Sequence, residues 1–245
     1  MNSKNALITG VSRPLGLGLA VARQLAAQGY HVILAARDVG QAEPLAAELR
    51  EAGFSASAMP LDLADCSSID ELAEHVAAAI DHLDVLVNNA SAMPDFHTHS
   101  ALEVDLEALQ ALFAVNVFGS WALIQALLPL LRRAPAARIV NVTSAAAQQI
   151  GKRDPGPLFS PAYSLAKYTL NALTATLATS LAQTPILINA VDPGSVASHP
   201  ERGDDENDRA PAEAAKGVVW AATLDANGPT GGLFFDGKPV SVTLQ

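Results

Sequence analysis

Residues 6–26 read ALITGVSRPLGLGLAVARQLA, an apolar run that passes through a glycine-containing turn into a stretch rich in alanine and leucine. The run Ala6–Ile8 predicts a buried strand and Gly16–Gln28 predicts a helix, so the chain opens with a strand–turn–helix unit. The backbone N–H groups of such a turn, with the helix N-terminus behind it, can bind a pyrophosphate. The residues that we expect to form this binding turn are Gly10, Ser12, Arg13, Leu15 and Gly16.

Short apolar runs alternate with helical stretches along the rest of the chain. Further strands are predicted at His31–Ala35, Ser57–Pro60, Val85–Val87, Arg138–Val142, Leu187–Val191 and Gly232–Phe235. Further helices are predicted at Val39–Ala52, Ser67–His82, Leu106–Arg133, Pro161–Thr184 and Pro211–Leu224. This alternation is typical of an α/β protein. We therefore expect a single domain over residues 1–245, built as a doubly wound Rossmann sheet of about seven parallel strands with helices on both faces.

The end of the second predicted strand indicates which dinucleotide the chain binds. An acidic residue at this place binds the ribose 2′-hydroxyl of NAD, but Ala36 stands there and Arg37 follows. Arginine suits a 2′-phosphate because its guanidinium makes forked, charge-assisted hydrogen bonds, and Arg13 in the turn is a second candidate for the same phosphate. The pattern favours NADP(H). NAD(H) is the less favoured cofactor, with Asp38 as the acidic residue that would bind its ribose. A further alternative is that Arg13 and Arg37 are ordinary exposed surface residues without a ligand.

Tyr163 and Lys167 are four residues apart in a predicted helix, which places both side chains on one face. A phenol has an ordinary pKa of about 10, and a nearby ammonium stabilises the phenolate and lowers that pKa. The pair therefore predicts a tyrosine that acts as a general acid/base. Alone it is weak evidence, because the same spacing occurs by chance on solvated helices.

The bulk composition excludes several classes of partner. Half of the 245 residues are hydrophobic, the formal net charge is −10, and the basic surface that nucleic acids require is absent. An anionic membrane surface repels such a chain, and the longest apolar candidate, Trp121–Leu131, is interrupted by a glutamine and a proline, so we expect a buried helix there. The single cysteine, Cys66, excludes an internal disulfide and fits a cytoplasmic protein. His97 and His99 lack further ligands, so no metal site is expected.

Together these residues resemble the short-chain dehydrogenase/reductase family over nearly the whole chain. The turn from Thr9 to Gly16 is similar to the family's cofactor turn, and Asp62-Leu63 is similar to the pair that flanks the adenine. Asn88-Asn89-Ala90 resembles the segment after the fourth strand that supports the cofactor, so the resemblance gives Asn89 and Ala90 that role. It also places Pro193, Gly194 and Val196 near the nicotinamide.

The resemblance further implies a catalytic set made of Asn116, Ser144, Tyr163 and Lys167. By this resemblance, we expect Ser144 to donate a hydrogen bond to the substrate oxygen and Tyr163 to deliver the proton. Lys167 lowers the pKa of Tyr163 and holds the nicotinamide ribose, and Asn116 positions a water.

The chain departs from the family pattern in three places. Pro14 and Ser91 stand where the family has glycine, which puts the geometry of the cofactor turn in question. Ser144 and Tyr163 are 19 positions apart, which implies a longer loop at Gln148–Ser160.

The arginine after the second strand and the stretch before Tyr163 resemble the carbonyl-reductase-like, NADPH-using branch of the family. The expected function is reduction of a ketone or aldehyde, or the reverse oxidation of a small-molecule alcohol. One alternative is a reductase of 3-oxoacyl thioesters, although no basic patch for an acidic carrier protein is evident. The other is a non-catalytic NADP(H)-binding sensor or scaffold. The predicted helices Leu106–Arg133 and Pro161–Thr184 suggest a homodimer or homotetramer.

Overall fold

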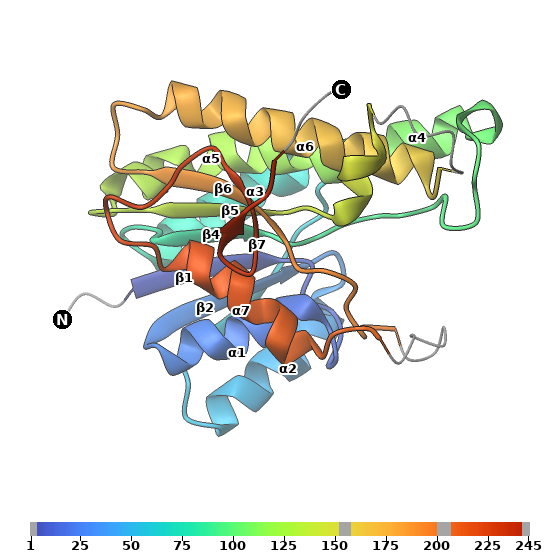
Figure 1. The fold of residues 1–245 in the computed structure, drawn as a ribbon. Coiled ribbons are helices and arrows are strands. Elements are labelled where there is room, and N and C mark those ends of the chain that lie inside the picture. The colour runs from blue at the N-terminus through green and yellow to red at the C-terminus, as the bar shows by residue number, and fades with distance from the viewer. Residues whose placement is uncertain (1–3, 152–157, 200–206, 242–245) are drawn as a thin grey trace.

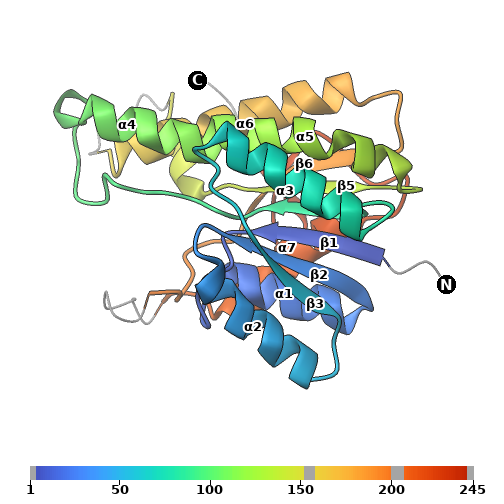
Figure 2. The ribbon, with the colours of Figure 1, turned by 180° about the vertical axis from the view of Figure 1, so that it is seen from behind.

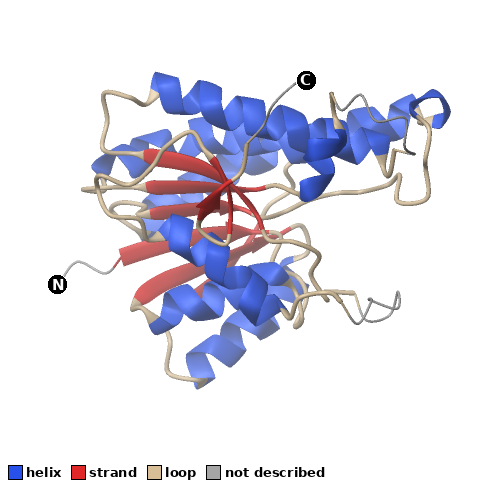
Figure 3. Cartoon of the chain, in the orientation of Figure 1, coloured by secondary structure: helices blue, strands red, loops and turns tan. Residues whose placement is uncertain are grey.

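Eight strands lie side by side in one sheet, in the order β3-β2-β1-β4-β5-β6-β7-β8 (Figures 1 and 3). The computed structural model describes residues 4–151, 158–199 and 207–241. The strands are β1 (Lys4–Thr9), β2 (Tyr30–Ala36), β3 (Ala56–Pro60), β4 (Val85–Asn88), β5 (Arg138–Val142), β6 (Leu187–Asp192), β7 (Leu233–Phe235) and β8 (Lys238–Pro239). The long helices are α1 (Leu17–Ala27), α2 (Val39–Glu51), α3 (Cys66–Ala79), α4 (Leu106–Phe113), α5 (Ser120–Arg133), α6 (Pro161–Ser180) and α7 (Pro211–Ala222). Short helical segments are η1 (Ala101–Glu103), η2 (Ala114–Gly119) and η3 (Ala145–Gln149).

The strands β1 to β7 are all parallel, which confirms the predicted sheet. The two-residue strand β8 was not predicted and pairs antiparallel with β7. Asp236 and Gly237 connect β7 to β8, and their φ angles are 47° and 73°. A two-residue Asp-Gly turn with both φ angles positive matches the twist of a hairpin, so the sequence carried a signal for this element.

Two helical layers cover the sheet. Helices α1, α2 and α7 pack on one face, while α3, α5 and α6 pack on the other (Figures 1 and 2). Because both faces are covered, the central strands are almost wholly apolar, and Leu7, Ile33, Leu86 and Ile188 have no exposed surface. The order of the strands reverses between β1 and β4, and in such sheets ligands bind at this switch point, outside the carboxyl ends of the strands.

The predicted helix Leu106–Arg133 is not regular along its length. Helix α4 ends at Phe113, the segment η2 that follows has π-helical geometry, and α5 resumes at Ser120. The whole stretch is long enough to cross a membrane, and an 18-residue window within it has a mean hydropathy of 1.8, so it passes that test by length and composition alone. Its α5 part packs as a core helix in this fold, since Leu123, Leu127 and Leu131 have no exposed surface.

Two predicted helices end earlier than expected. The helix predicted to His82 ends at Ala79, and the one predicted to Thr184 ends at Ser180. The longer loop predicted before Tyr163 lies partly outside the described residues, at 152–157, as does part of the acidic run 204–208. At the described ends of the longer loop, the Gln149 side chain binds both the N–H and the C=O of Phe159, at 2.9 and 3.2 Å.

Candidate active site

The predicted cofactor turn lies against the segment after β4, at the switch point of the sheet. Thr9, the last residue of β1, accepts hydrogen bonds through Oγ1 from the N–H groups of Asn89 and Ala90, both at 3.0 Å. The Asn89 side chain donates in return to the carbonyl of Thr9 at 2.8 Å. A Cβ on Gly10 would lie 2.6 Å from Cα of Ala90, so the close approach of the two segments requires glycine at that position.

Pro14 fits the turn despite replacing a glycine of the resembled family. The N–H of Gly16 donates to the carbonyl of Arg13 at 3.1 Å, which closes a four-residue turn with Pro14 at its second position. The fixed φ of proline suits this position. Helix α1 begins one residue later, and its N-cap residue Gly16 makes no side-chain hydrogen bond to the helix. The first N–H groups of α1 are therefore open to an anion.

Of the two charged residues after β2, Asp38 caps the next helix and Arg37 is exposed at the end of the strand. Asp38 is the N-cap of α2, and its Oδ1 accepts from the N–H of Gly40 at 2.9 Å. This contact commits part of the carboxylate to the helix and weakens the alternative in which Asp38 binds a ribose. Arg37 is exposed at the carboxyl end of β2, and Arg13, Ser12 and Leu15 lie in the turn, where Arg13 and Leu15 are exposed.

Asp62 and Leu63 form a tight loop after β3. The Asp62 side chain accepts from the N–H of Ala64, and its own N–H donates to Oγ of Ser68, both at 2.9 Å. Leu63 is buried and packs against η2, where a Cβ on Gly119 would lie 2.2 Å from the Leu63 carbonyl oxygen. This contact links the predicted adenine side of the site to the segment that carries Asn116.

Three hydroxyl groups meet at Tyr163, in the first turn of α6. Ser144 and Ser91 lie beside the Tyr163 hydroxyl, and hydrogen bonding from their side chains lowers the pKa of the phenol. Ser144 follows β5 and also accepts from the N–H of Ala146 at 3.2 Å, where it caps η3. The structure thus brings the predicted pair Ser144 and Tyr163 together and adds Ser91 to it.

Lys167 is buried beneath Tyr163. Its ammonium donates to the carbonyl of Val142 at 2.9 Å and lies 5.4 Å from the centroid of the Tyr163 ring. Burial lowers the pKa of Lys167 from its ordinary 10.5 to about 8, because a low-dielectric interior disfavours the charged ammonium.

The protein's own groups raise the pKa of Tyr163, whereas we expected a lowered pKa. Burial raises the pKa of the phenol, the hydrogen bonds from Ser144 and Ser91 lower it, and the charges of Asp192 and Asp95 raise it again. We expected Lys167 to lower this pKa, but the ammonium is bonded to a backbone carbonyl and faces the ring. Burial outweighs the stabilising contacts, so within the protein Tyr163 is held as the neutral phenol.

Asn116 lies in the middle of η2 and is 1% exposed. Its side-chain amide pairs with the backbone of Ala92, and the expected role of Asn116 in positioning a water stays a prediction. Its Oδ1 accepts from the Ala92 N–H at 2.8 Å, and its Nδ2 donates to the Ala92 carbonyl at 2.9 Å. Since Thr9 holds Ala90, the residue between these two anchors, Ser91, is fixed beside Tyr163.

The turn after β6 is held from two sides. The N–H of Gly194 donates to Oδ1 of Asp192 at 2.9 Å, and Arg209 donates to the Pro193 carbonyl at 2.9 Å and to Asp236 at 2.9 Å. Val196 forms an isolated parallel bridge with Arg209. Burial raises the pKa of Asp192, and the hydrogen bond from Gly194 lowers it.

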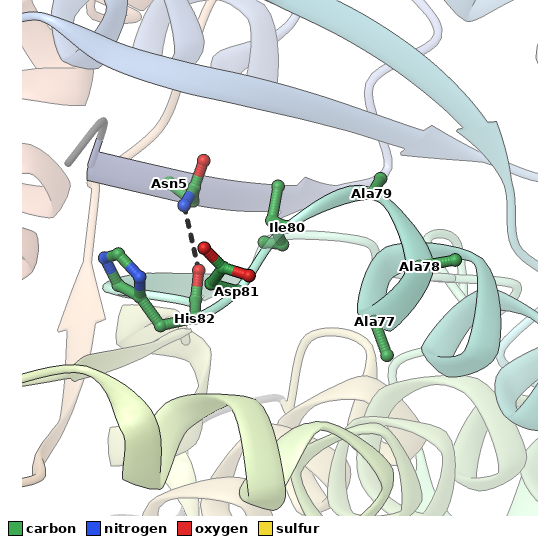
Figure 4. Close-up of a pocket in the computed structure, with 7 residues that line it drawn as sticks. All are labelled: Asn5, Ala77, Ala78, Ala79, Ile80, Asp81 and His82. Carbon is green, nitrogen blue, oxygen red and sulfur yellow. Dashed lines mark hydrogen bonds between the residues drawn. The ribbon is translucent and has the colours of Figure 1, made fainter.

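A cavity of about 260 Å³ lies at the amino ends of the strands, on the side of the sheet opposite the predicted site, between the start of β1 and the end of α3 (Figure 4). Asn5, three alanines, Ile80, Asp81 and His82 line it, and Nδ2 of Asn5 donates to the His82 carbonyl at 2.9 Å. None of the predicted site residues lies there. Among the described residues, no group of three or more potential metal ligands is present.

Four residues with a place in this site were missed by the sequence analysis. Ser91 was noted only as a replaced glycine, although a hydroxyl directly after Asn-Asn-Ala was a usable signal. Thr9 was named only as the first residue of the cofactor turn, and its contact with the segment after β4 was not predicted. Asp95 and Arg209 act through contacts with residues far along the chain, for which the sequence gives no local signal.

The strand order and the turn at the switch point define a doubly wound Rossmann fold. The sequence model of the short chain dehydrogenase family matches residues 4–209, and the chain therefore belongs to that family. This confirms the resemblance given by its motifs.

Known proteins with similar sequence or structure differ in what they act on. The chain is 32% identical to a fatty acyl-CoA reductase of Acinetobacter baylyi over 191 residues, which are 78% of this chain but only 62% of that longer protein. It is 33% identical to a 3-oxoacyl-[acyl-carrier-protein] reductase of Synechocystis over 199 residues, 81% of this chain and 76% of that one. A metagenomic short-chain oxidoreductase solved in complex with NADP superposes with a TM-score of 0.76 and 29% identity over 94% of each chain.

Proposed function

We propose that this oxidoreductase transfers hydride between NADP(H) and the carbonyl or alcohol group of a small molecule, with Tyr163 as general acid/base. The observation that carries the proposal is the cluster at the carboxyl edge of the sheet. There the Tyr163 hydroxyl bonds with Ser144, and the Lys167 ammonium lies 5.4 Å from the Tyr163 ring. A ketone or aldehyde reductase is the form that we favour.

The residues at the switch point fit a dinucleotide. Gly10 approaches Ala90 so closely that a Cβ would not fit between them, and the start of α1 has N–H groups without a side-chain cap. The choice of NADP(H) is supported by the exposed Arg37 and by the role of Asp38 as a helix cap. It is also supported by the related oxidoreductase that was crystallised with NADP.

In this proposal four groups of residues would hold the cofactor. Gly10, Ser12, Leu15 and Gly16 would hold the pyrophosphate, and Arg13 and Arg37 would hold the 2′-phosphate. The adenine contacts Asp62 and Leu63. The nicotinamide end contacts Asn89, Ala90, Pro193, Gly194 and Val196.

When bound, NADPH supplies the hydride. Ser144 donates a hydrogen bond to the substrate oxygen, where negative charge develops. Tyr163 then delivers its proton to that oxygen. The raised pKa of Tyr163 suits this task, since a proton donor must be protonated at neutral pH. Lys167 places a positive charge below the phenolate that remains and binds the nicotinamide ribose. Asn116 keeps the loop of Ser91 in place through Ala92.

The substitution Tyr163→Phe tests the mechanism. We expect NADPH consumption with a panel of ketones and aldehydes to fall by about 10²–10⁴-fold, which is the usual contribution of general acid/base catalysis. Binding of NADPH, followed by nicotinamide fluorescence, should stay within about twofold of the wild type. Retained turnover would refute the role of Tyr163. Tight NADPH binding by the wild type without turnover of any substrate would favour the non-catalytic sensor or scaffold.

A 3-oxoacyl-thioester reductase is the second candidate, because two relatives are named as reductases of acyl thioesters. The comparison that separates the candidates is kcat/KM for a short 3-oxoacyl-CoA against that for free ketones of equal chain length. A higher kcat/KM for the thioester would replace our first choice.

A cytoplasmic location and a homo-oligomeric state complete the proposal. The single cysteine supports the former. Exposed apolar side chains on η2 and α5 support the latter.

A further inference from the structure

The helix that carries Tyr163 and Lys167 begins without a cap of its own. Ser160 stands at the N-cap position of α6 with φ 48° and ψ 63°, a left-handed conformation, and its side chain makes no hydrogen bond to the helix. Pro161 follows and has no N–H. Ala162 and Tyr163 therefore have the first backbone N–H groups of α6, and these need an acceptor from elsewhere because no preceding turn of the helix exists.

Asp95 provides this acceptor from the loop after β4, 67 residues earlier in the chain. Its Oδ2 accepts from the N–H of Ala162 at 2.7 Å and from that of Tyr163 at 3.4 Å. The N–H of Ser160 donates to the carbonyl of Thr98 at 3.0 Å, so the same loop holds the start of α6 at a further point. Asp95 is only 8% exposed.

We propose that Asp95 is a positioning residue that caps α6 from the loop after β4 and holds Tyr163 against Ser144 and Ser91. The two ends of that loop support each other. Near its start, Thr9 and Asn116 fix the residues on either side of Ser91, and near its end Asp95 fixes the backbone of Tyr163. One short loop thus sets both sides of the hydrogen bond between Ser91 and Tyr163.

The negative charge of Asp95 acts on the phenol of Tyr163, which a neutral cap would not do. The second oxygen of the carboxylate, Oδ1, is buried and has no hydrogen-bond partner among the described residues. A negative charge near the phenol disfavours the phenolate, and Asp95 and Asp192 both act on Tyr163 in this direction. The Lys167 ammonium lies 5.4 Å from the centroid of the same ring but is bonded to the Val142 carbonyl. Removing the charge of Asp95 therefore lets Tyr163 lose its proton at lower pH.

Two substitutions separate the cap from the charge. Asp95→Asn keeps an oxygen that accepts from Ala162 and Tyr163 but removes the charge, whereas Asp95→Ala removes both. The matched control is Asp105→Asn, because Asp105 is an exposed N-cap of α4 whose Oδ1 accepts from the Glu107 N–H at 2.9 Å.

The first readout is the titration of Tyr163 itself, followed by the ultraviolet absorbance of the phenolate. The chain has three tyrosines, so subtracting the titration of the same protein carrying Tyr163→Phe isolates this one. We expect Asp95→Asn to move the titration to lower pH and Asp105→Asn to leave it in place. This readout needs no substrate.

The second readout is activity and melting temperature. This part rests on the proposed function, since it uses the reduction of a carbonyl substrate. Asp95→Ala should lower kcat by about ten- to a hundredfold, the scale of effect expected when a reacting group is displaced by about 1 Å, and lower Tm by about 2–4 °C. Asp95→Asn should recover most of kcat, while the fall of kcat/KM at high pH moves to lower pH.

An unmoved Tyr163 titration in Asp95→Asn, together with a kcat in Asp95→Ala equal to that of the wild type, would overturn the proposal. If the wild type turns over no substrate, the proposed function fails. The Tyr163 titration in Asp95→Asn then still tests the charge of Asp95, and the Tm of Asp95→Ala compared with that of Asp95→Asn still tests the cap.

Discussion

Ser91 shows how a single departure from the resembled family pattern changes the candidate active site. The family has glycine at this place, whereas here a hydroxyl hydrogen-bonds with Tyr163 beside the hydroxyl of Ser144. Anchors on both neighbours hold Ser91 there, through Thr9 and Asn116. The extra hydroxyl favours the phenolate and partly offsets the effect of burial on Tyr163.

Replacement of this hydroxyl gives the first prediction at the level of residues. Ser91→Gly should lower kcat about two- to tenfold, because a hydrogen bond contributes about 0.5–1.5 kcal/mol. Since the bond lowers the pKa of Tyr163, its loss should raise that pKa. In alcohol oxidation, which needs the phenolate, the rise of kcat/KM with pH should then move to higher pH.

The control for Ser91 is Ser100→Ala, in the same loop, where the lost hydroxyl caps only the short segment η1. We expect no change of the pH profile in the control. A Ser91→Gly variant with the same pH profile as the control would show that the hydroxyl has no part in proton transfer.

The lowered pKa of the buried Lys167 predicts that the stability of the protein depends on pH. Below pH 8 the lysine is protonated in both states, and between pH 8 and 10.5 only the unfolded chain keeps the proton. The unfolded state then binds more protons, so the free energy of unfolding rises with pH across this window. The interval from 8 to 10.5 corresponds to about 3 kcal/mol, at about 1.36 kcal/mol per pH unit.

Urea unfolding of the wild type and of Lys167→Met from pH 8 to pH 10.5 measures this effect. The wild type should gain about 3 kcal/mol relative to the variant over the window. The other titrating groups are common to both proteins, so they cancel in the comparison. Parallel curves would show that Lys167 titrates as an exposed lysine does.

At the level of elements, the sequence predicted every major strand and helix but not the change of helical geometry at η2. The apolar pattern of 106–133 continues without a break, so nothing in the periodicity marks the wider turn at Ala114–Gly119. The turn is set by tertiary contacts, namely Asn116 with Ala92 and Gly119 with Leu63. In the same way, residue types and order predicted Ser144, Tyr163 and Lys167, whereas the contacts of Asp95 and Arg209 depend on the folded backbone.

Gly119 gives a prediction for this element. A Cβ at this position would lie 2.2 Å from the carbonyl oxygen of Leu63, so the backbone has to move in Gly119→Ala. We expect a loss of about 1–3 kcal/mol, seen as a fall in Tm of about 2–4 °C per kcal/mol. NADPH should also bind more weakly, because Leu63 borders the proposed adenine site.

The matched control is Gly217→Ala in α7, where the nearest atoms to a Cβ are 3.6 Å away. Alanine there should stabilise the helix by about 0.5–1 kcal/mol. Equal effects of the two substitutions on Tm and on NADPH affinity would contradict the close packing of η2 on Leu63.

For the whole molecule, the sheet explains why residues from the entire chain meet at one edge. Thr9, Asn88, Val142 and Asp192 each end a parallel strand, so the segments that follow them all begin at the carboxyl edge. The glycine turn, Ser91, Ser144 and the Pro193 turn come from these four segments, and α6 adds Tyr163 and Lys167. The alternation of strands and helices in the sequence was sufficient to predict this convergence.

The outer surface of the same molecule predicts self-association. Phe118 is 59% exposed and Trp121 is 38% exposed. With Ala122 and Gln125 they line a hollow of about 320 Å³ on η2 and α5. Aromatic side chains grouped on the exposed face of a helix are typical of interfaces. Each chain carries a formal net charge of −10, so repulsion opposes the contact of two copies at low ionic strength. Salt screens this repulsion, since the Debye length falls from about 10 Å at 0.1 M to about 3 Å at 1 M.

We therefore expect the wild type to sediment as a dimer or tetramer, with a dissociation constant that falls as salt is added. Trp121→Glu places a charge in the apolar contact and should yield a monomer at every salt concentration. Leu102→Glu is the control, because Leu102 is 97% exposed and lies on η1, outside this hollow. A monomeric wild type, or dissociation by both substitutions alike, would show that the hollow on η2 and α5 is not the interface. Association that weakens with salt would instead indicate an interface held by ion pairs, for which this apolar surface is unsuited.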